Sequence, residues 1–437
     1  MMEIELKYGS ETLTAKLSHI KSVQELQPRR VATLQTVEAM LTYSLGKPIG
    51  TYPFARLFQR ARNLALVLPP YRAGDPVWQM LPFVLKVLHD NGVQDEEVKI
   101  LIGYHATYGD ASLNAEPVIQ LQERYSVFVH DLHDAGELEY VGETRSGLPV
   151  FVNRILLDVE HIVLLGAVEY GLLPDFDGGP RMVVPGCAGY ETLARICAQT
   201  YNAKTRRFDL LLDSHEETRA LLRQNLREAY KCLPATFGLY PVANGKGQII
   251  AAPAGHPIQA HIAGSKMIEC LYKIPVFQQA DLTIVSPGGS LHDATFRSAF
   301  RSLCQAAKAT RPGGVIILTA ECRDGLGMDA FRKHFPANGD KDGEARLHLF
   351  AMPEDIISAT ISQLVHRFRI FLISALEKKV VRRMGMQAAD SLDEAFDCAM
   401  QEMPFSPVVH ILPQGNPINP IPVMSHLEPV NQELRTN

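Results

Sequence analysis

Residues 63–105 read NLALVLPPYRAGDPVWQMLPFVLKVLHDNGVQDEEVKILIGYH, and this stretch decides the fold. Residues 63–68 are predicted to form a buried strand, residues 78–88 an amphipathic helix and residues 98–102 a second buried strand. A strand, a helix and a strand at this spacing make a βαβ unit, which predicts a parallel sheet covered by helices. Sites in such sheets lie at the carboxyl ends of the strands, where His105 follows the second strand.

A second unit of the same kind follows later in the chain. Residues 281–285 and 315–320 are predicted strands on either side of a helix at 294–309. We therefore predict a two-domain α/β protein with parallel or mixed sheets flanked by helices. The predicted first domain is 1–272, completed by the C-terminal segment 402–437, and the second is 273–401.

The composition is that of an ordinary globular protein. Of 437 residues, 46% are hydrophobic and 21% charged, and the net charge of -5 gives no reason to expect a nucleic-acid partner. Seven scattered cysteines without a CxxC pair favour reduced thiols over disulfides or a zinc site. No stretch approaches the roughly 20 apolar residues that span a bilayer. We expect a cytoplasmic protein without a membrane segment.

Residues 166–192 read GAVEYGLLPDFDGGPRMVVPGCAGYET and follow a predicted buried strand at 161–165. Six glycines and three prolines interrupt regular structure, which predicts a long loop. Long ordered loops on α/β scaffolds usually carry function, so we favour a loop that approaches a ligand over a surface excursion.

Several segments, in this order and spacing, make the chain resemble the nickel-dependent lactate racemase family over residues 45–400. They are LGKPIGTYPFARLF, PPYR, LPFVLKVL, GYH, HDAGELEYVGETRSGLPVFVNR, GAVE…FDGG…PGCAGYET, AGHPIQAHIAG, ADLTIVSPGG and RPGGVIILTAECRDGLG. The resemblance implies an active site in a cleft between two α/β domains. It also implies an isomerase that interconverts enantiomers or epimers of 2-hydroxy acids with a lysine-tethered nickel pincer nucleotide and two acid/base histidines.

Carried over residue by residue, the resemblance gives His105 one acid/base role. The second acid/base histidine would fall at Gly171, which has no side chain. The tethering lysine falls at Arg181, whose guanidinium stays protonated and cannot form the acyl linkage under mild conditions. The nickel-binding histidine falls at Cys197, and a family aspartate falls at Pro69. We therefore expect no tethered cofactor and no metal at these positions.

The family residues that contact substrate fall near Ser298 and Arg301. If Arg301 converges with Arg72 and Arg181, three guanidiniums would bind a carboxylate or phosphate bidentately. The alternative is that each arginine pairs with a carboxylate of the chain. The candidate partners are Glu169, Asp175 and Asp177, and the two aspartates could instead hold a hard cation.

Other residues carry weaker signals. The turn 286–290, with Gly288 and Gly289 between a strand and a helix, resembles loops that bind anions through backbone N–H groups. It matches neither the P-loop nor the dinucleotide fingerprint. His261, in a helical stretch, is expected to pack or cap rather than to act. Cys187 and Cys197 are expected to be small buried residues rather than nucleophiles.

Three hypotheses follow from the sequence. In the first, the protein binds a small 2-hydroxy acid or related anion through Arg72, His105, Arg181 and Arg301, with Ser298, Gly288 and Gly289, and without the tethered cofactor. In the second, it is a functional racemase or epimerase whose cofactor is attached differently. In the third, it is a non-catalytic partner or regulatory paralogue of such an enzyme. The sequence does not predict an oligomeric state.

Overall fold

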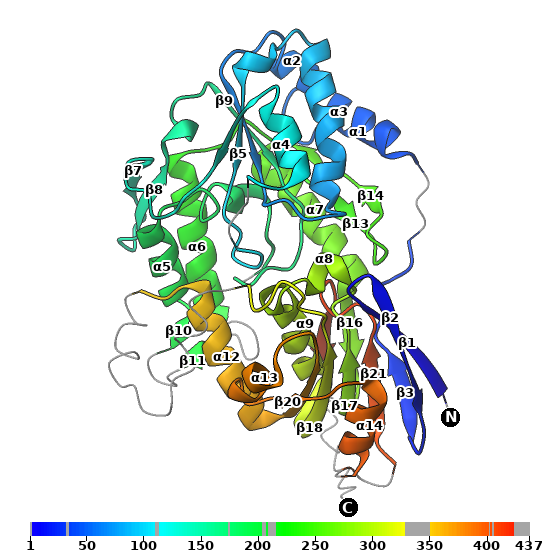
Figure 1. Cartoon of the computed structure of the whole chain (residues 1–437). Coiled ribbons are helices and arrows are strands. Elements are labelled where there is room, and N and C mark those ends of the chain that lie inside the picture. Colours follow the sequence, from blue (N-terminus) through cyan, green and yellow to red (C-terminus); the bar gives the residue numbers. More distant parts are fainter. Residues whose placement is uncertain are drawn as a thin grey trace, which may run out of the picture.

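The structure is a computed structural model. It describes residues 2–31, 35–109, 113–173, 175–202, 207–208, 216–327, 350–401, 403 and 406–423. Two six-stranded sheets form the framework, the first in the upper half and the second in the lower half of Figure 1. No helix in these ranges is both long and apolar enough to cross a membrane.

The first sheet has the strand order β15-β12-β9-β4-β5-β6. The strands are β4 (Leu64–Leu68), β5 (Val98–Ile102), β6 (Ser126–Val129), β9 (His161–Leu165), β12 (Phe237–Leu239) and β15 (Ala254–Gly255). Its pairs are parallel except that β15 runs antiparallel to β12. The predicted βαβ unit is confirmed, with α3 (Pro76–Asp90) between β4 and β5.

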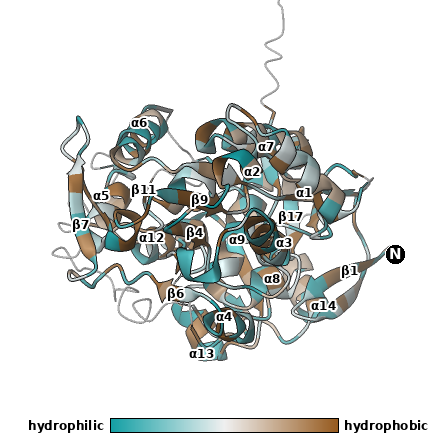
Figure 2. Ribbon diagram, turned by 90° about the horizontal axis from the view of Figure 1, so that it is seen from above, coloured by the Kyte–Doolittle hydropathy of each residue, from teal (hydrophilic) through white to brown (hydrophobic). Residues whose placement is uncertain are grey.

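Helices cover both faces of this sheet. They are α1 (Val37–Gly46), α2 (Phe54–Leu57), α3 and α4 (Glu116–Gln122) on one face, and α5 (Tyr190–Ala198), α6 (Glu216–Cys232) and α7 (Pro257–Tyr272) on the other. Along β4, Leu64 and Leu66 pack with the first group, whereas Ala65 and Val67 face the second. Burial of both faces explains the uninterrupted apolar run of β4. Unlike β4, the helix α6 carries hydrophilic segments, which are teal in Figure 2.

The second sheet is parallel throughout and has the order β20-β19-β18-β17-β21-β3. The strands are β3 (Ser22–Glu25), β17 (Ala280–Val285), β18 (Thr310–Thr319), β19 (Arg369–Ile373), β20 (Gln387–Ala388) and β21 (Val408–Leu412). On one face, Ile316 and Leu318 pack with α9 (Phe296–Ala309) and α12 (Pro353–Arg367). On the other, Val315 and Ile317 pack with α14 (Leu392–Met400) and the hairpin of β1 (Met2–Tyr8) and β2 (Glu11–Leu17).

This sheet corrects the predicted division of the chain. We assigned residues 1–272 and 402–437 to one domain, yet β21 pairs with β17, and β3 extends the same sheet beside β21. The N-terminal hairpin also lies with the second sheet, at the lower right of Figure 1, where Leu6 and Leu17 bury against Leu282 and Ile284. Burial of these apolar faces therefore joins both ends of the described chain to the C-terminal half.

The remaining elements are short or connect the two halves. They are 3-10 helices η1 (Asp95–Glu97), η2 (Arg154–Leu156) and η3 (Gly179–Met182), helices α8 (Ser290–Asp293) and α13 (Lys378–Arg383), and strands β7 (Leu138–Glu143), β8 (Pro149–Asn153), β10 (Tyr201–Asn202), β11 (Arg207–Phe208), β13 (Val242–Ala243), β14 (Ile249–Ala251), β16 (Lys273–Val276) and β22 (Asn419–Pro422). The region from α12 to β20 was not predicted, and β16 pairs with β22 where the chain passes between the halves.

Candidate functional site

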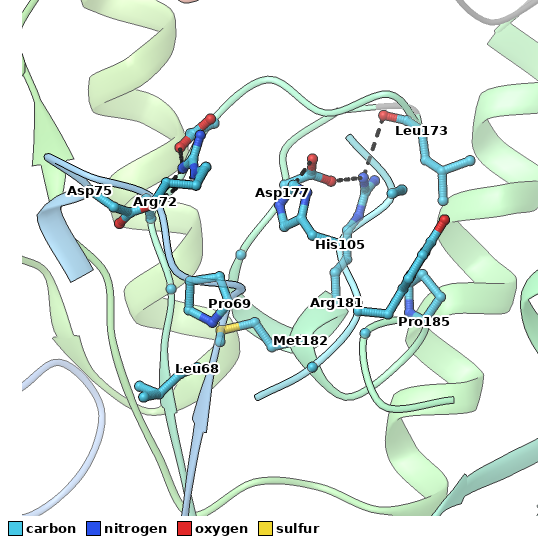
Figure 3. Close-up of a pocket in the computed structure, with 18 residues that line it drawn as sticks. Leu68, Pro69, Arg72, Asp75, His105, Leu173, Asp177, Arg181, Met182 and Pro185 are labelled. Atoms are coloured by element: carbon cyan, nitrogen blue, oxygen red, sulfur yellow. Dashed lines mark hydrogen bonds and ion pairs between the residues drawn. The ribbon is translucent and has the colours of Figure 1, made fainter. Parts of the chain in front are cut away.

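The candidate site lies where three neighbouring parallel strands end. Leu68 ends β4 just before Arg72, Ile102 ends β5 before His105, and Leu165 ends β9 before the glycine-rich loop. Because β9, β4 and β5 are adjacent and parallel, their carboxyl ends meet at one edge. The pocket there, which we call the arginine pocket, is lined by Leu68, Pro69, Arg72, Asp75, Gly103, Tyr104, His105, Ala106, Gly166, Ala167, Glu169, Leu173, Asp177, Gly178, Arg181, Met182, Pro185 and Gly186 (Figure 3).

Arg72 is held rigidly on one side of this pocket. Its Nε and Nη2 donate to Asp75 Oδ2 at 3.1 and 2.5 Å, and Nη2 also donates to Glu169 Oε1 at 3.1 Å. The guanidinium carbon lies over the ring of Tyr108, 3.5 Å from its centroid. Its remaining nitrogen, Nη1, is buried and has no hydrogen-bond partner. Since a buried donor without a partner is costly, Nη1 is suited to an incoming acceptor.

His105 lines the same pocket and is held by two contacts. Its ring stacks on Tyr108 at 4.5 Å between centroids, and its Nδ1 accepts from the backbone N–H of Thr107 at 3.2 Å. That bond leaves the Nε2 nitrogen, 3.8 Å from Asp177 Oδ2, to carry the proton of the neutral ring. Burial lowers the pKa of His105, although Asp177 opposes this effect. A neutral imidazole in this tautomer can donate its Nε2–H to an oxygen atom of a ligand.

Asp177 joins His105 to Arg181. Figure 3 shows its carboxylate between the two side chains. Arg181 Nη1 donates to Asp177 Oδ1 at 3.3 Å and to the carbonyl of Leu173 at 3.4 Å, and Thr107 Oγ1 donates to Asp177 Oδ2 at 3.4 Å. The guanidinium of Arg181 is therefore engaged with a carboxylate and a backbone carbonyl.

Both arginines of the pocket pair with carboxylates of the chain, which was the alternative to three guanidiniums that converge on a ligand. Arg72 pairs with Asp75 and Glu169, and Arg181 with Asp177. Asp175 instead pairs with Arg223 of α6, its Oδ2 lying 2.8 Å from the Nε atom, so the two aspartates of the loop have different partners. Among the residues the structure describes, no group of three or more His, Cys, Asp or Glu side chains could hold a metal ion.

The structure does not bring Arg301 into the arginine pocket. Its Nε donates to the carbonyl of Asn416 at 2.8 Å, and its Nη1 and Nη2 donate to the carbonyls of Gly171 and Ile418 at 3.3 and 3.4 Å. The expected convergence of three guanidiniums fails because backbone carbonyls use this one. Ser298, too, is engaged elsewhere, in the capping box that Thr295 forms at the start of α9.

Gly288 and Gly289 line a second, larger cavity and not the arginine pocket. Two amides of their turn are already used: Gly288 N donates to Ser286 Oγ at 3.1 Å, and Ser290 N donates to the carbonyl of Gly9 at 2.9 Å. The hairpin tip thus covers part of the turn that we expected to bind an anion.

His261 and the two cysteines have supporting positions, as predicted. His261 Nε2 donates to the carbonyl of Asp177 at 2.9 Å, and a side chain at Gly179 would collide with its ring. Cys187, in the loop, and Cys197, in α5, are fully buried in the core. Burial, reinforced by Glu354 and Asp355, raises the pKa of the Cys197 thiol well above its usual value, which disfavours the thiolate that a metal would require.

Three residues of the site were not predicted from the sequence: Asp75, Thr107 and Tyr108. Asp75 caps α3 through Val77 N at 2.8 Å, and Asp before Pro at the first helical position was a readable capping signal. Tyr108, whose hydroxyl donates to Glu169 Oε2, carries no motif of its own and becomes visible only when the loop after β5 folds back.

Comparisons with known proteins agree with this architecture and define the family. The lactate racemase N-terminal domain matches residues 8–207, and the lactate racemase C-terminal domain matches residues 276–418. The chain belongs to the lactate racemase family. The family is one of isomerases that use a nickel-based cofactor.

Two curated relatives are similar over nearly their whole length. The lactate racemase of Thermoanaerobacterium thermosaccharolyticum is 24% identical over 426 residues, covering 95% of this chain and 98% of the relative. The lactate racemase of Lactiplantibacillus plantarum is 24% identical over 441 residues, covering 95% and 99%.

Two solved structures share the fold. The lactate racemase apoprotein from Thermoanaerobacterium thermosaccharolyticum superposes with a TM-score of 0.79 at 22% identity, covering 96% of this chain and 100% of the other. A protein from Thermotoga maritima gives 0.61 at 15% identity, covering 88% and 96%. The predicted two-domain α/β fold is confirmed.

Proposed function

We propose that the protein binds a small 2-hydroxy acid or a related anion in the arginine pocket, without the tethered nickel cofactor of its family. One observation carries the binding half of this proposal: Arg72 Nη1 is buried in the pocket wall without a hydrogen-bond partner. A ligand carboxylate would supply the missing acceptor, and a hydrogen bond to a charged donor is among the stronger ones in proteins. His105, which also stacks on Tyr108, would then contact the hydroxyl group.

The residues present do not fit the tethered cofactor. The position that the resemblance implies for the anchoring lysine is Arg181, already paired with Asp177, and no lysine lines the arginine pocket. The position implied for the nickel ligand is Cys197, which is buried in α5, away from the pocket wall, with its thiol held protonated. We therefore derive no chemical step through a nickel centre.

The site's own residues can bind and orient a ligand. Arg72 would fix the carboxylate, and neutral His105 would donate its Nε2–H in a hydrogen bond to the hydroxyl oxygen. The pocket also contains more negative than positive groups: Asp75, Glu169 and Asp177 against Arg72 and Arg181. A bound anion adds a further negative charge near His105 and should raise the pKa of its imidazole. Because protonated His105 would attract the anion, binding is expected to strengthen as the pH is lowered toward 6.

Calorimetric titration with D- and L-lactate tests the proposal. We expect binding by the wild type and a loss of about 10- to 100-fold in Arg72→Gln, because a charged hydrogen bond contributes roughly 1.5–3 kcal/mol. Arg124→Gln is the matched control, since Arg124 makes a similar two-atom contact with Asp95 on the surface. Absence of binding to the wild type, or equal affinity in Arg72→Gln, would contradict the proposal.

A further inference from the structure

A buried arginine beside the second sheet reaches the turn that carries His105. Arg297 lies in the first turn of α9 and is 4% exposed. Its Nε and Nη2 donate to the carbonyl of Ala106 at 3.2 and 2.8 Å, and Nη2 also donates to the Tyr104 hydroxyl at 2.6 Å. Nη1 donates to Glu354 Oε1 at 2.7 Å. All three nitrogens of the guanidinium are therefore engaged, two of them with the residues on either side of His105.

These contacts act on the arginine pocket from outside. Tyr104, His105 and Ala106 line the pocket, and Arg297 is not among the residues that line it. A ligand in the pocket would therefore contact His105 and not Arg297. Any influence of Arg297 on such a ligand must pass through the turn that it holds.

The turn itself fixes the imidazole. His105 N donates to the carbonyl of Gly109 at 3.1 Å, and Gly109 N donates to that of His105 at 2.7 Å. Within this turn the Thr107 N–H donates to His105 Nδ1 at 3.2 Å, which places the proton of the neutral ring on Nε2. Because Ala106 lies between His105 and Thr107, a hold on its carbonyl restrains both the ring and the N–H group that selects its tautomer.

The approach of Arg297 depends on a glycine. Gly109 has a φ of +88°, and an added Cβ atom would lie 3.3 Å from Arg297 Nη1. Glycine thus allows both the backbone conformation of the turn and the close approach of the guanidinium. Further along α9, Arg301 donates to the carbonyl of Gly171 in the glycine-rich loop. One helix packed against the second sheet therefore contacts two of the loops that follow strands of the first.

The alternative is that Arg297 serves only the packing of α9 against α12, through its ion pair with Glu354. A buried ion pair contributes little to stability by itself, because both charges lose their hydration. This pair uses only Nη1 of the guanidinium. The other two nitrogens donate to a carbonyl and a hydroxyl group of the turn, a geometry that a guanidinium satisfies and an ammonium group does not.

We infer that Arg297 is a positioning residue of the site: it holds the turn at residues 105–109, so that the imidazole of His105 keeps its place and its tautomer in the wall of the arginine pocket. Arg297 itself does not contact the ligand. The inference deepens the proposed function and rests on it, because His105 is proposed to donate to the hydroxyl oxygen of the ligand.

The test uses two variants that separate the two roles of Arg297. Arg297→Lys keeps a positive charge beside Glu354 but cannot hold the carbonyl and the hydroxyl group together. Glu354→Gln removes the buried negative charge and keeps an oxygen acceptor for Nη1, so the contacts with the His105 turn remain. We expect both variants to lower the melting temperature. Arg311→Lys, at an exposed pair with Asp281, is the matched control.

Calorimetric titration with lactate is the first readout. We expect Arg297→Lys to weaken binding by about tenfold, since the loss of one hydrogen bond between His105 and the ligand is worth about that factor. Glu354→Gln and Arg311→Lys should bind lactate as the wild type does.

Nitrogen-15 NMR of the histidine rings reports the state of His105 without a ligand. In the wild type and in Glu354→Gln we expect the Nε2–H tautomer, with a pKa that burial holds below its usual value. In Arg297→Lys we expect a mixture of tautomers and a pKa nearer to the ordinary value of about 6.5. Since lysine keeps the charge, such a change reports the position of the ring and not the loss of a charge. The His105→Gln variant assigns the signal.

The outcomes separate the inference from the proposed function. If Arg297→Lys binds lactate as the wild type does, or if Glu354→Gln weakens binding equally, the inference is wrong while the proposed function stands. An unchanged His105 signal in Arg297→Lys also contradicts the inference. If lactate does not bind the wild type, the proposed function is wrong, and the His105 signal still decides whether Arg297 positions the ring.

A milder variant covers the case in which Arg297→Lys does not fold. Tyr104→Phe removes only one acceptor of the guanidinium and leaves the carbonyl of Ala106 in place. We expect it to shift the His105 signal in the same direction by a smaller amount. No shift in this variant would overturn the inference as well.

Discussion

Asp177 occupies the space that a side chain on Gly171 would need. A Cβ atom added to Gly171 would lie 2.3 Å from Asp177 Oδ1 and 2.6 Å from Oδ2. That carboxylate is the group that Arg181 and Thr107 contact and that approaches His105 Nε2 to 3.8 Å. The position at which the family resemblance implies a second acid/base histidine is thus backbone only, and an aspartate held by Arg181 takes the space instead.

We expect Gly171→Ala to destabilise the protein, by about 1–3 kcal/mol, because the new methyl group must displace the paired carboxylate of Asp177. Thermal unfolding followed by circular dichroism measures this loss. Gly46→Ala in α1 is the control, since an added Cβ there meets no atom within 4 Å. Equal melting temperatures for wild type and Gly171→Ala would show that Asp177 is not fixed as described.

We expect Glu169→Gln to bind lactate more tightly than the wild type, by about tenfold. The substitution removes one negative charge beside Arg72, and a unit charge at such distances contributes on the order of 1–3 kcal/mol in a partly buried site. Calorimetry at pH 7 measures the change. Glu139→Gln, which breaks an exposed pair with Arg154, is the control and should have no effect. Weaker binding by Glu169→Gln would mean that Glu169 itself contacts the ligand.

We expect the protein to lose stability as the pH falls from about 6.5 to 4. Burial lowers the pKa of both His261 and His292 to about 4 in the folded protein. Below about pH 6.5, the unfolded chain therefore binds protons that the folded protein does not. Each histidine then contributes up to about 1.4 kcal/mol per pH unit. Glu169, with its pKa brought to about 2, adds a loss between about pH 4.5 and 2.

Urea unfolding at pH 7.5 and 5.0 measures this dependence. His261→Gln retains a donor for the carbonyl of Asp177 but cannot titrate, so its stability should fall less between the two pH values than that of the wild type. The same fall in both proteins, or a gain in stability at pH 5.0, would contradict the assignment of neutral buried histidines.

We expect alkylation of the native protein to label Cys270, and not Cys197. Cys270 is exposed, whereas Cys197 is fully buried with its pKa raised well above the usual range. Mass spectrometry of peptides after brief treatment with iodoacetamide shows which thiols react, and denatured protein serves as the positive control. Labelling of Cys197 at a rate near that of Cys270 would mean that this thiol is accessible and could serve as a metal ligand.

The sequence predicted the parts of the fold that local pattern specifies. The run at 64–68, the helix around Trp78 and the run at 98–102 have unambiguous periodicity, and their order required parallel pairing with Arg72 and His105 at one edge. The partners of those residues could not be predicted. Whether Arg72 contacts a ligand or Glu169 depends on the path of the loop after β9. Local hydrophobic periodicity does not predict that path.

The contacts of Arg301 and His292 could not be predicted either, because their partners come from distant segments of the chain. Arg301 was expected in the pocket because of its position in the family pattern, but the carbonyls of Gly171, Asn416 and Ile418, far apart in sequence, use its donors. His292 was not singled out, because its neighbours Glu169 and Asn416 come from distant segments. Residues 402–437 were assigned to the first domain, yet β21 lies between β17 and β3 in the second sheet, and these partners come from distant segments of the chain.

The most direct test of the central claim is the intact mass and nickel content of the protein produced with nickel and the enzymes that build the family cofactor. Our account predicts the mass of the bare chain and no bound nickel, because Arg181 cannot form the tether and Cys197 is not a competent ligand. A mass increment together with about one nickel per chain, as a tethered family cofactor requires, would contradict it. That result would show that the cofactor is attached through another side chain.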